Sequence, residues 1–157
     1  MSLQLTGAGK DNSIANLQVR LPIAVIGGGL TGVDTTTESL AYYPLQVEKF
    51  LARYELLVQK HGEDEVRARW NEEEAEIADE FIAHAVAIRD AKAQARKEGR
   101  ECDVISLLKS WGGSTLVYRK GLVDAPSYRL NHEEVEKALE EGIFFLGDAS
   151  PIEVEVD

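Results

Sequence analysis

The sequence predicts one α/β domain, a partial three-layer arrangement around a parallel sheet that is interrupted by a helical insertion. Three observations predict it. Residues 21–26 form an apolar run of strand length that ends in a glycine-rich turn. Strand character returns at residues 114–120 and 143–146, and a long helical periodicity lies between these strands. With 157 residues, of which 44% are hydrophobic, the chain is long enough for one domain with a core.

The first half of the chain predicts a lead-in segment, a strand, a helix and then the insertion. Residues 1–20 form the lead-in. The continuous apolar run at 21–26 is typical of a parallel strand covered on both faces, and a helix follows the glycines until Pro44, which predicts a break. Residues 45–111 carry apolar side chains at helical spacing, from Val47 to Val58 and from Trp70 to Ile88, and Gly99 is expected to end the longer helix.

The second half predicts a return to the sheet. Residues 114–120 are read as the second strand, and Asn131 is placed to cap a helix, with Glu134 at the reciprocal capping-box position and Gly142 at its end. Residues 143–146 and 152–156 are read as further strands. We therefore expect a Rossmann-like domain from residues 21–44 and 112–157, truncated at its C-terminal end, with 45–111 as an α-helical insertion after the first helix.

Composition excludes several classes of function. The formal net charge of −11 disfavours general binding to nucleic acid. A single cysteine, Cys102, excludes disulfides and thiolate clusters, and the three histidines show no ligand spacing, so we expect no metal site. No apolar run is long enough to span a bilayer. The sequence is therefore expected to be a cytoplasmic protein that is not bound to a membrane.

The segment from Gly27 to Gly32 predicts a phosphate-binding turn. Gly27, Gly29 and Gly32 fit the pattern G-x-G-x-x-G, in which the first glycine allows a tight turn, the second lets a pyrophosphate approach the backbone, and the third lets helix and strand pack closely. The free N–H groups and the dipole of the helix that begins here favour an anion. Gly28, Leu30 and Thr31 complete the expected site. A flexible loop without a ligand is the alternative interpretation.

The second strand ends in two bases instead of the acid that commonly binds the ribose of NAD. If residues 114–120 are the second strand, Arg119 and Lys120 stand where the adenosine ribose would lie and suit a 2′-phosphate. This pair favours NADP(H) over NAD(H) or FAD. Ordinary surface bases are the alternative interpretation.

Three stretches resemble one family of flavoproteins. "VIGGGLTGVD", "VYRKG" and "EEVEKALEEGIFFL", followed by Ser150 and Pro151, are similar to the NADPH-binding domain shared by the glutamate synthase small chain and dihydropyrimidine dehydrogenase. The resemblance covers residues 21–42 and 114–157, and the helical insertion departs from it.

The resemblance implies a larger oxidoreductase in which NADPH passes hydride to an FAD held by a second domain of the same protein. It implies that the three motif glycines line the pyrophosphate and that Arg119 and Lys120 hold the 2′-phosphate. It also implies that Asp34 lies toward the nicotinamide. The alternative interpretation of Asp34 is an acid in the first helical turn that complements the helix dipole. Arg129 is a possible third cation. Gly32 replaces the family's usual alanine, a change expected to be harmless.

The chain lacks a second glycine fingerprint for FAD and any cysteine cluster, so it is expected to be a fragment without turnover of its own and without catalytic residues. A second function class stays open, a non-catalytic α/β interaction module whose nucleotide site is vestigial. The sequence indicates neither the electron acceptor of the parent protein nor the oligomeric state.

Overall fold

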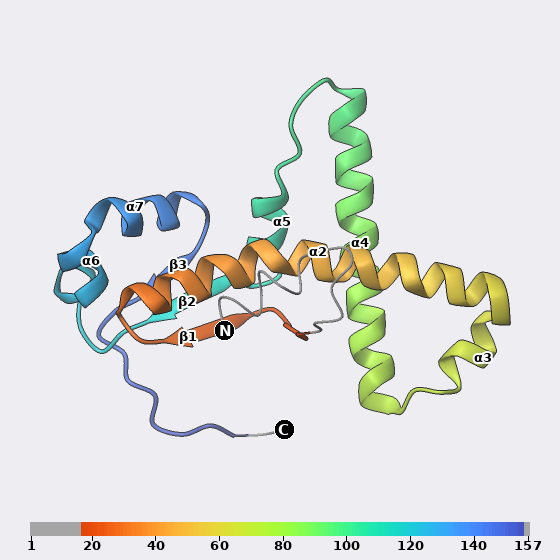
Figure 1. Cartoon of the computed structure of the whole chain (residues 1–157), viewed down its shortest axis with the longest axis horizontal. Helices are drawn as coiled ribbons and strands as arrows, with labels where there is room; N and C mark the ends of the chain where they lie inside the picture. Colours follow the sequence, from red (N-terminus) through yellow and green to blue (C-terminus); the bar gives the residue numbers. More distant parts are fainter. Residues whose placement is uncertain (1–16, 156–157) are drawn as a thin grey trace. The chain divides into compact units, whose positions relative to one another are not determined.

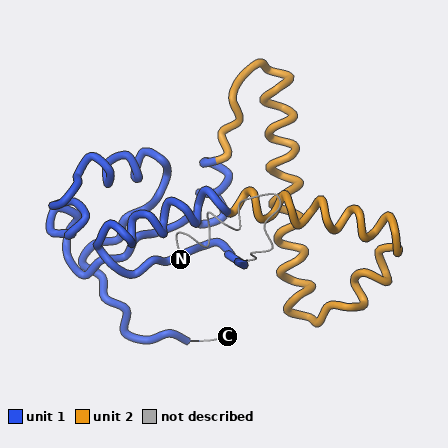
Figure 2. Tube along the Cα trace, in the orientation of Figure 1, with its two compact units in different colours: residues 1–42, 105–157 blue, residues 43–104 orange. Residues whose placement is uncertain are grey.

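The computed structural model describes residues 17–155, and the chain in it divides into two compact units. One unit combines Met1–Tyr42 with Ile105–Asp157, and the other is Tyr43–Val104 (Figure 2). Of the described residues, 63% are helical and 8% lie in strands. Helices thus dominate the chain.

The first unit contains a small parallel sheet. Its strands are β1 (Ile23–Ile26), β2 (Ser114–Val117) and β3 (Phe144–Leu146), in the order β1-β2-β3 (Figure 1). Ile26 pairs with Val117, which in turn pairs with Leu146, so the carboxyl ends of all three strands lie at one edge. The glycine turn follows β1 at this edge.

The expected Rossmann-like three-layer fold is wrong. The sheet has three strands of three or four residues, and the segment predicted as a further strand at 152–156 has no strand structure through residue 155. Ile152 is fully exposed and Val154 is 83% exposed. Alternating apolar residues form a strand only when a neighbouring strand and a core are there to receive them, and this segment has neither.

The predicted break at Pro44 is also wrong, because α2 (Leu30–His61) continues through it. A proline inside a helix removes one backbone hydrogen bond and crowds the preceding turn. Here the residues around it are tightly packed, since Tyr43 and Val47 are completely buried. Tertiary packing therefore outweighs the local preference, and the boundary between the two units falls inside this continuous helix, between Tyr42 and Tyr43.

The second unit is built from the later part of α2, the short α3 (Glu63–Arg67) and the long α4 (Glu72–Lys97), and α4 crosses α2 (Figure 1). α3 and α4 are separate helices, and Asn71 begins α4 with a full capping box to Glu74. The core of this unit is apolar and aromatic. Its buried residues include Tyr43, Val47, Leu51, Phe81, Ala85 and Ile88.

The remaining helices are short. They are α5 (Val104–Ser110), the 3₁₀ turn η1 (Leu122–Asp124), α6 (Pro126–Leu130) and α7 (His132–Glu140). Asn131 caps α7 as predicted, with its side-chain oxygen accepting from the Glu134 N–H. Gly99 and Gly142 follow the ends of α4 and α7 at positive φ, as expected for residues that terminate helices. Between residues 17 and 155, no helix has the length and apolar character that crossing a membrane requires.

Candidate functional site

The glycine turn joins the end of β1 to the start of α2. Gly27 has φ of +141°, a conformation that side chains disfavour, and its N–H donates to the carbonyl of Val117 at 2.9 Å. This hydrogen bond extends the β1–β2 pairing by one step. The turn is therefore held against the end of β2.

The other two motif glycines have different steric environments. A Cβ at Gly32 would overlap the carbonyl oxygen of Gly27 and lie 3.2 Å from Cδ1 of Leu116. A Cβ at Gly29 would meet no atom of the described residues within 4 Å. Gly32 thus allows close packing of α2 on the strands, whereas Gly29 leaves open space beside the backbone, as the motif predicts for a site where a phosphate approaches.

The first turn of α2 presents backbone donors at this open space. The carbonyl of Gly29 accepts from the N–H groups of Gly32, at 2.9 Å, and Val33, at 3.2 Å. Within residues 17–155, none of the N–H groups at positions 28–31 donates to a backbone carbonyl. Leu30 and Thr31 of the expected site are among these positions. N–H groups that lack a backbone acceptor at the start of a 32-residue helix favour an anion.

Two contacts that the sequence did not predict support the turn at Gly28. The ring of Tyr118 packs so closely that a Cβ at Gly28 would lie 2.6 Å from its Cδ2 atom. The N–H of Ser127, in α6, donates to the carbonyl oxygen of Gly28 at 2.9 Å. In the sequence, the aromatic residue before the basic pair was a signal for the contact of Tyr118. No sequence feature indicated the hydrogen bond from Ser127.

Arg119 and Lys120 follow β2 in an irregular, exposed segment instead of extending the strand. The backbone here is tied to the segment after β3, because Tyr118 accepts from the Ala149 N–H and Lys120 accepts from the Asp148 N–H through their carbonyl oxygens. Since β1 and β2 are parallel neighbours, both bases lie at the same edge of the sheet as the glycine turn.

The other two candidates have different surroundings. Asp34 is half-buried and lies beyond the first turn of α2, which holds no acidic residue, so a role in complementing the helix dipole there is not supported. Arg129 is exposed in α6 and lies 3.8 Å from a carboxylate oxygen of Asp124. Arg129 therefore already has an anionic neighbour of its own.

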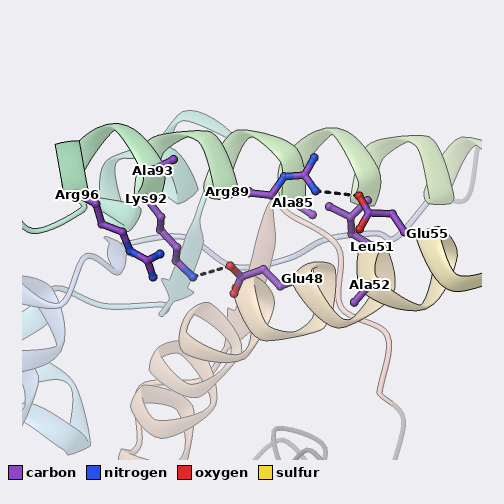
Figure 3. Close-up of a pocket in the computed structure, with 9 residues that line it drawn as sticks. All are labelled: Glu48, Leu51, Ala52, Glu55, Ala85, Arg89, Lys92, Ala93 and Arg96. Atoms are coloured by element: carbon purple, nitrogen blue, oxygen red, sulfur yellow. Dashed lines mark hydrogen bonds and ion pairs between the residues drawn. The ribbon is translucent and has the colours of Figure 1, made fainter.

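A groove of about 410 Å³ lies in the second unit between α2 and α4 (Figure 3). Ion pairs join its walls, from Lys92 to Glu48 and, at 2.8 Å, from Arg89 to Glu55. Its other lining residues are Leu51, Ala52, Ala85, Ala93 and Arg96. Small side chains between charged pairs account for the gap, and the paired charges hold the two helices together.

An arginine is held by aromatic and acidic side chains at the far end of α2. Arg67 pairs with Asp79 and Glu63 at 2.8 Å each, and its guanidinium lies 5.6 Å from the ring centre of Tyr54 and 5.8 Å from that of Trp70. The hydrogen bond with Asp79 contributes most to raising the pKa of Arg67. This cluster holds α3 against both long helices.

A contact between a buried tyrosine and a half-buried histidine lies in the same unit. The hydroxyl of Tyr43 is 2.6 Å from Nδ1 of His84. Desolvation by burial lowers the pKa of His84, while the charge of Glu80 opposes the shift. In the part of the chain that the structure describes, no three His, Cys, Asp or Glu residues are grouped to hold a metal.

Comparison with known proteins finds a similarity that runs along the entire chain. Over all 157 residues the chain is 39% identical to "Uncharacterized protein RP006" of Rickettsia prowazekii (strain Madrid E), and it spans 20% of that protein's length. No family model and no solved structure matches the chain.

Proposed function

We propose that the turn from Gly27 to Gly32 binds the pyrophosphate of a dinucleotide and that this dinucleotide is NADP(H). The observation that carries the proposal is the contrast between Gly29 and Gly32. Close packing accounts for glycine at position 32, but no contact among residues 17–155 accounts for glycine at position 29. A ligand that must approach the backbone there supplies the missing reason.

The preference for NADP(H) rests on Arg119 and Lys120. They stand at the edge of the sheet that carries the turn, in the segment that follows β2, the strand next to β1. Two cations at the ribose end of a bound dinucleotide would pair with a 2′-phosphate, which NAD(H) lacks. Because the net charge of −11 repels an anion, binding one requires a local cationic pair.

The resemblance to the glutamate synthase small chain extends the proposal to the parent protein. In that wider form, this chain holds NADPH and hydride passes to an FAD bound by another domain. The chain spans a fifth of the Rickettsia protein, so a longer polypeptide has room for such a domain. This chain contributes binding and orientation, and no acid, base or nucleophile is assigned to it.

The test is titration calorimetry of the chain with NADPH and NADH, repeated with Gly29→Ala. The added methyl meets no atom of the described part of the chain, so the unfolding midpoint should stay the same. NADPH affinity should fall at least about tenfold because the methyl occupies the approach to the backbone. Unchanged affinity in the variant, or no binding of either nucleotide at millimolar concentration, would contradict the proposal. The latter result would favour the interaction module with a vestigial site.

A further inference from the structure

The two faces of the parallel sheet have different surroundings. Leu116, at the centre of β2, is 1% exposed, and its Cδ1 atom lies beside Gly32 in the first turn of α2. Val25 and Phe145 are its partners in register on β1 and β3, and both are partly covered. Because side chains in register share a face, these three residues define the face that α2 covers.

Among residues 17–155, no helix covers the outer row of the opposite face, which is apolar and partly exposed. Its outer row is Ile26, Val117 and Leu146, which are partners in register, and Phe144 lies in the row below. Ile26 is 62% exposed, Leu146 51% and Phe144 40%. The ammonium of Lys109 lies 5.6 Å from the ring centre of Phe144. Neighbouring strands lie about 4.8 Å apart, so the side chains of Ile26, Val117 and Leu146 form one continuous apolar row, which we call the open sheet face.

Parallel sheets are normally covered on both faces, and helices usually provide the cover. Ile26, Val117 and Leu146 are aliphatic partners in register, although the strands have only three or four residues each. They therefore form a contiguous apolar row and not scattered single side chains. A second copy of the chain is a poor candidate for the cover, because each copy carries a net charge of −11 and the two would repel each other.

The Rickettsia protein extends far beyond the part that this chain matches. The similarity runs through the whole chain, including all three strands, yet the chain spans 20% of that protein. The corresponding sheet in the relative is therefore part of a polypeptide about five times as long, with many further segments available to pack on it.

We propose that the open sheet face is an interaction surface that packs against an amphipathic helix supplied by the polypeptide that makes up the rest of the long relative. The apolar row Ile26–Val117–Leu146 receives the apolar stripe of that helix. This inference is independent of nucleotide binding, because the open sheet face lies on the side of the strands opposite the packing of α2.

The test measures the accessibility of a single thiol. Ile26→Cys and the control Leu56→Cys are made in a Cys102→Ser background. Leu56 is 66% exposed in the second unit, so the two introduced thiols start from similar exposure. Each variant is reacted with a maleimide as the isolated chain and as a chimera in which it replaces the matching fifth of the Rickettsia protein.

In the chimera, the thiol at position 26 should react at least about tenfold more slowly than in the isolated chain, since it becomes reachable only through local opening. The control thiol should react at the same rate in both. Equal rates at position 26 would overturn the proposal. Protection of position 26 in the isolated chain, together with a dimer in sedimentation, would overturn it in favour of a second copy.

A second measurement avoids dependence on folding of the chimera. The remainder of the Rickettsia protein is expressed separately and mixed with this chain or with its Leu146→Lys variant. Calorimetry should detect binding to the natural chain and at least about tenfold weaker binding to the variant, because a charge is buried against the apolar helix. Absence of binding, or equal binding by both, would overturn the proposal.

Discussion

The carbonyl oxygen of Gly27 occupies the space that a side chain on Gly32 would need. The family that the sequence resembles usually has alanine at the position of Gly32, and the sequence alone suggested that the difference was harmless. The structure shows that glycine fits closely at this position, whereas a side chain would meet a backbone atom of the turn that cannot rotate away. The packing of α2 on the sheet is thus closer than an alanine allows.

Gly32→Ala should therefore destabilise the first unit. Alanine improves helix propensity by up to about 1 kcal/mol, but forcing a methyl against backbone costs roughly 1–3 kcal/mol, so the net change should be a loss. Urea unfolding followed by amide signals of β1 and β2 measures it. Gly29→Ala is the matched control, and equal stability of the two variants would show that the close contact at Gly32 is unimportant.

Replacing Arg119 and Lys120 together by alanine should weaken NADPH binding far more than NADH binding. A hydrogen bond to a charged group contributes about 1.5–3 kcal/mol, so the loss for NADPH should be at least roughly tenfold. The control is Arg96→Ala with Lys97→Ala, another exposed pair of adjacent bases in the second unit. Calorimetry that shows equal weakening of both nucleotides would mean that the pair does not recognise the 2′-phosphate.

Stability of the second unit should depend on pH through His84. Burial lowers its pKa from the ordinary value of 6.5, so below pH 6.5 the unfolded state binds a proton that the folded state resists. The favourable contribution is fully present above pH 6.5 and is lost as the pH falls toward the folded-state pKa. His84→Gln keeps a hydrogen-bonding partner for Tyr43 but does not titrate.

Urea midpoints at pH 7.5 and about pH 5.5 compare the natural chain with this variant. The carboxylates titrate in both proteins, so the difference between the two pH dependences isolates His84. The natural chain should lose more stability on acidification. Identical pH dependence in the two proteins would contradict the assignment.

Arg67→Ala should loosen α3 from the long helices. The guanidinium contacts the rings of Tyr54 and Trp70 and two carboxylates, but its side chain is 35% exposed, so solvent screens the ion pairs. We expect a loss of roughly 0.5–2 kcal/mol. Arg67→Lys should recover only part of it, because lysine lacks the planar group that stacks on the rings.

Fluorescence of Trp70 during urea unfolding measures this loss in a Trp111→Phe background. Arg69→Ala is the control, because the Arg69 side chain is 71% exposed and its guanidinium pairs with Glu65 at 2.9 Å. A midpoint shift for Arg67→Ala no larger than that of the control would contradict a special role for the stacked arginine.

Several local features could be predicted from the sequence because they depend on neighbouring residues. The apolar runs at 21–26 and 143–146 contain β1 and β3, Asn131 caps α7, and glycines follow the ends of α4 and α7. The glycine spacing indicated a turn between strand and helix, and such a turn is present. Each of these depends on side-chain chemistry and backbone freedom within a few positions.

Only the tertiary structure decided the extent and packing of these elements. The helix α2 passes through Pro44 because its flanking residues are buried, the segment after β3 stays out of the sheet because no strand receives it, and Gly28 is covered by Tyr118 and bonded to Ser127. These outcomes depend on residues distant in the chain. The free energy of burying side chains exceeds the local preference of a proline or an alternating segment, so local pattern cannot determine them.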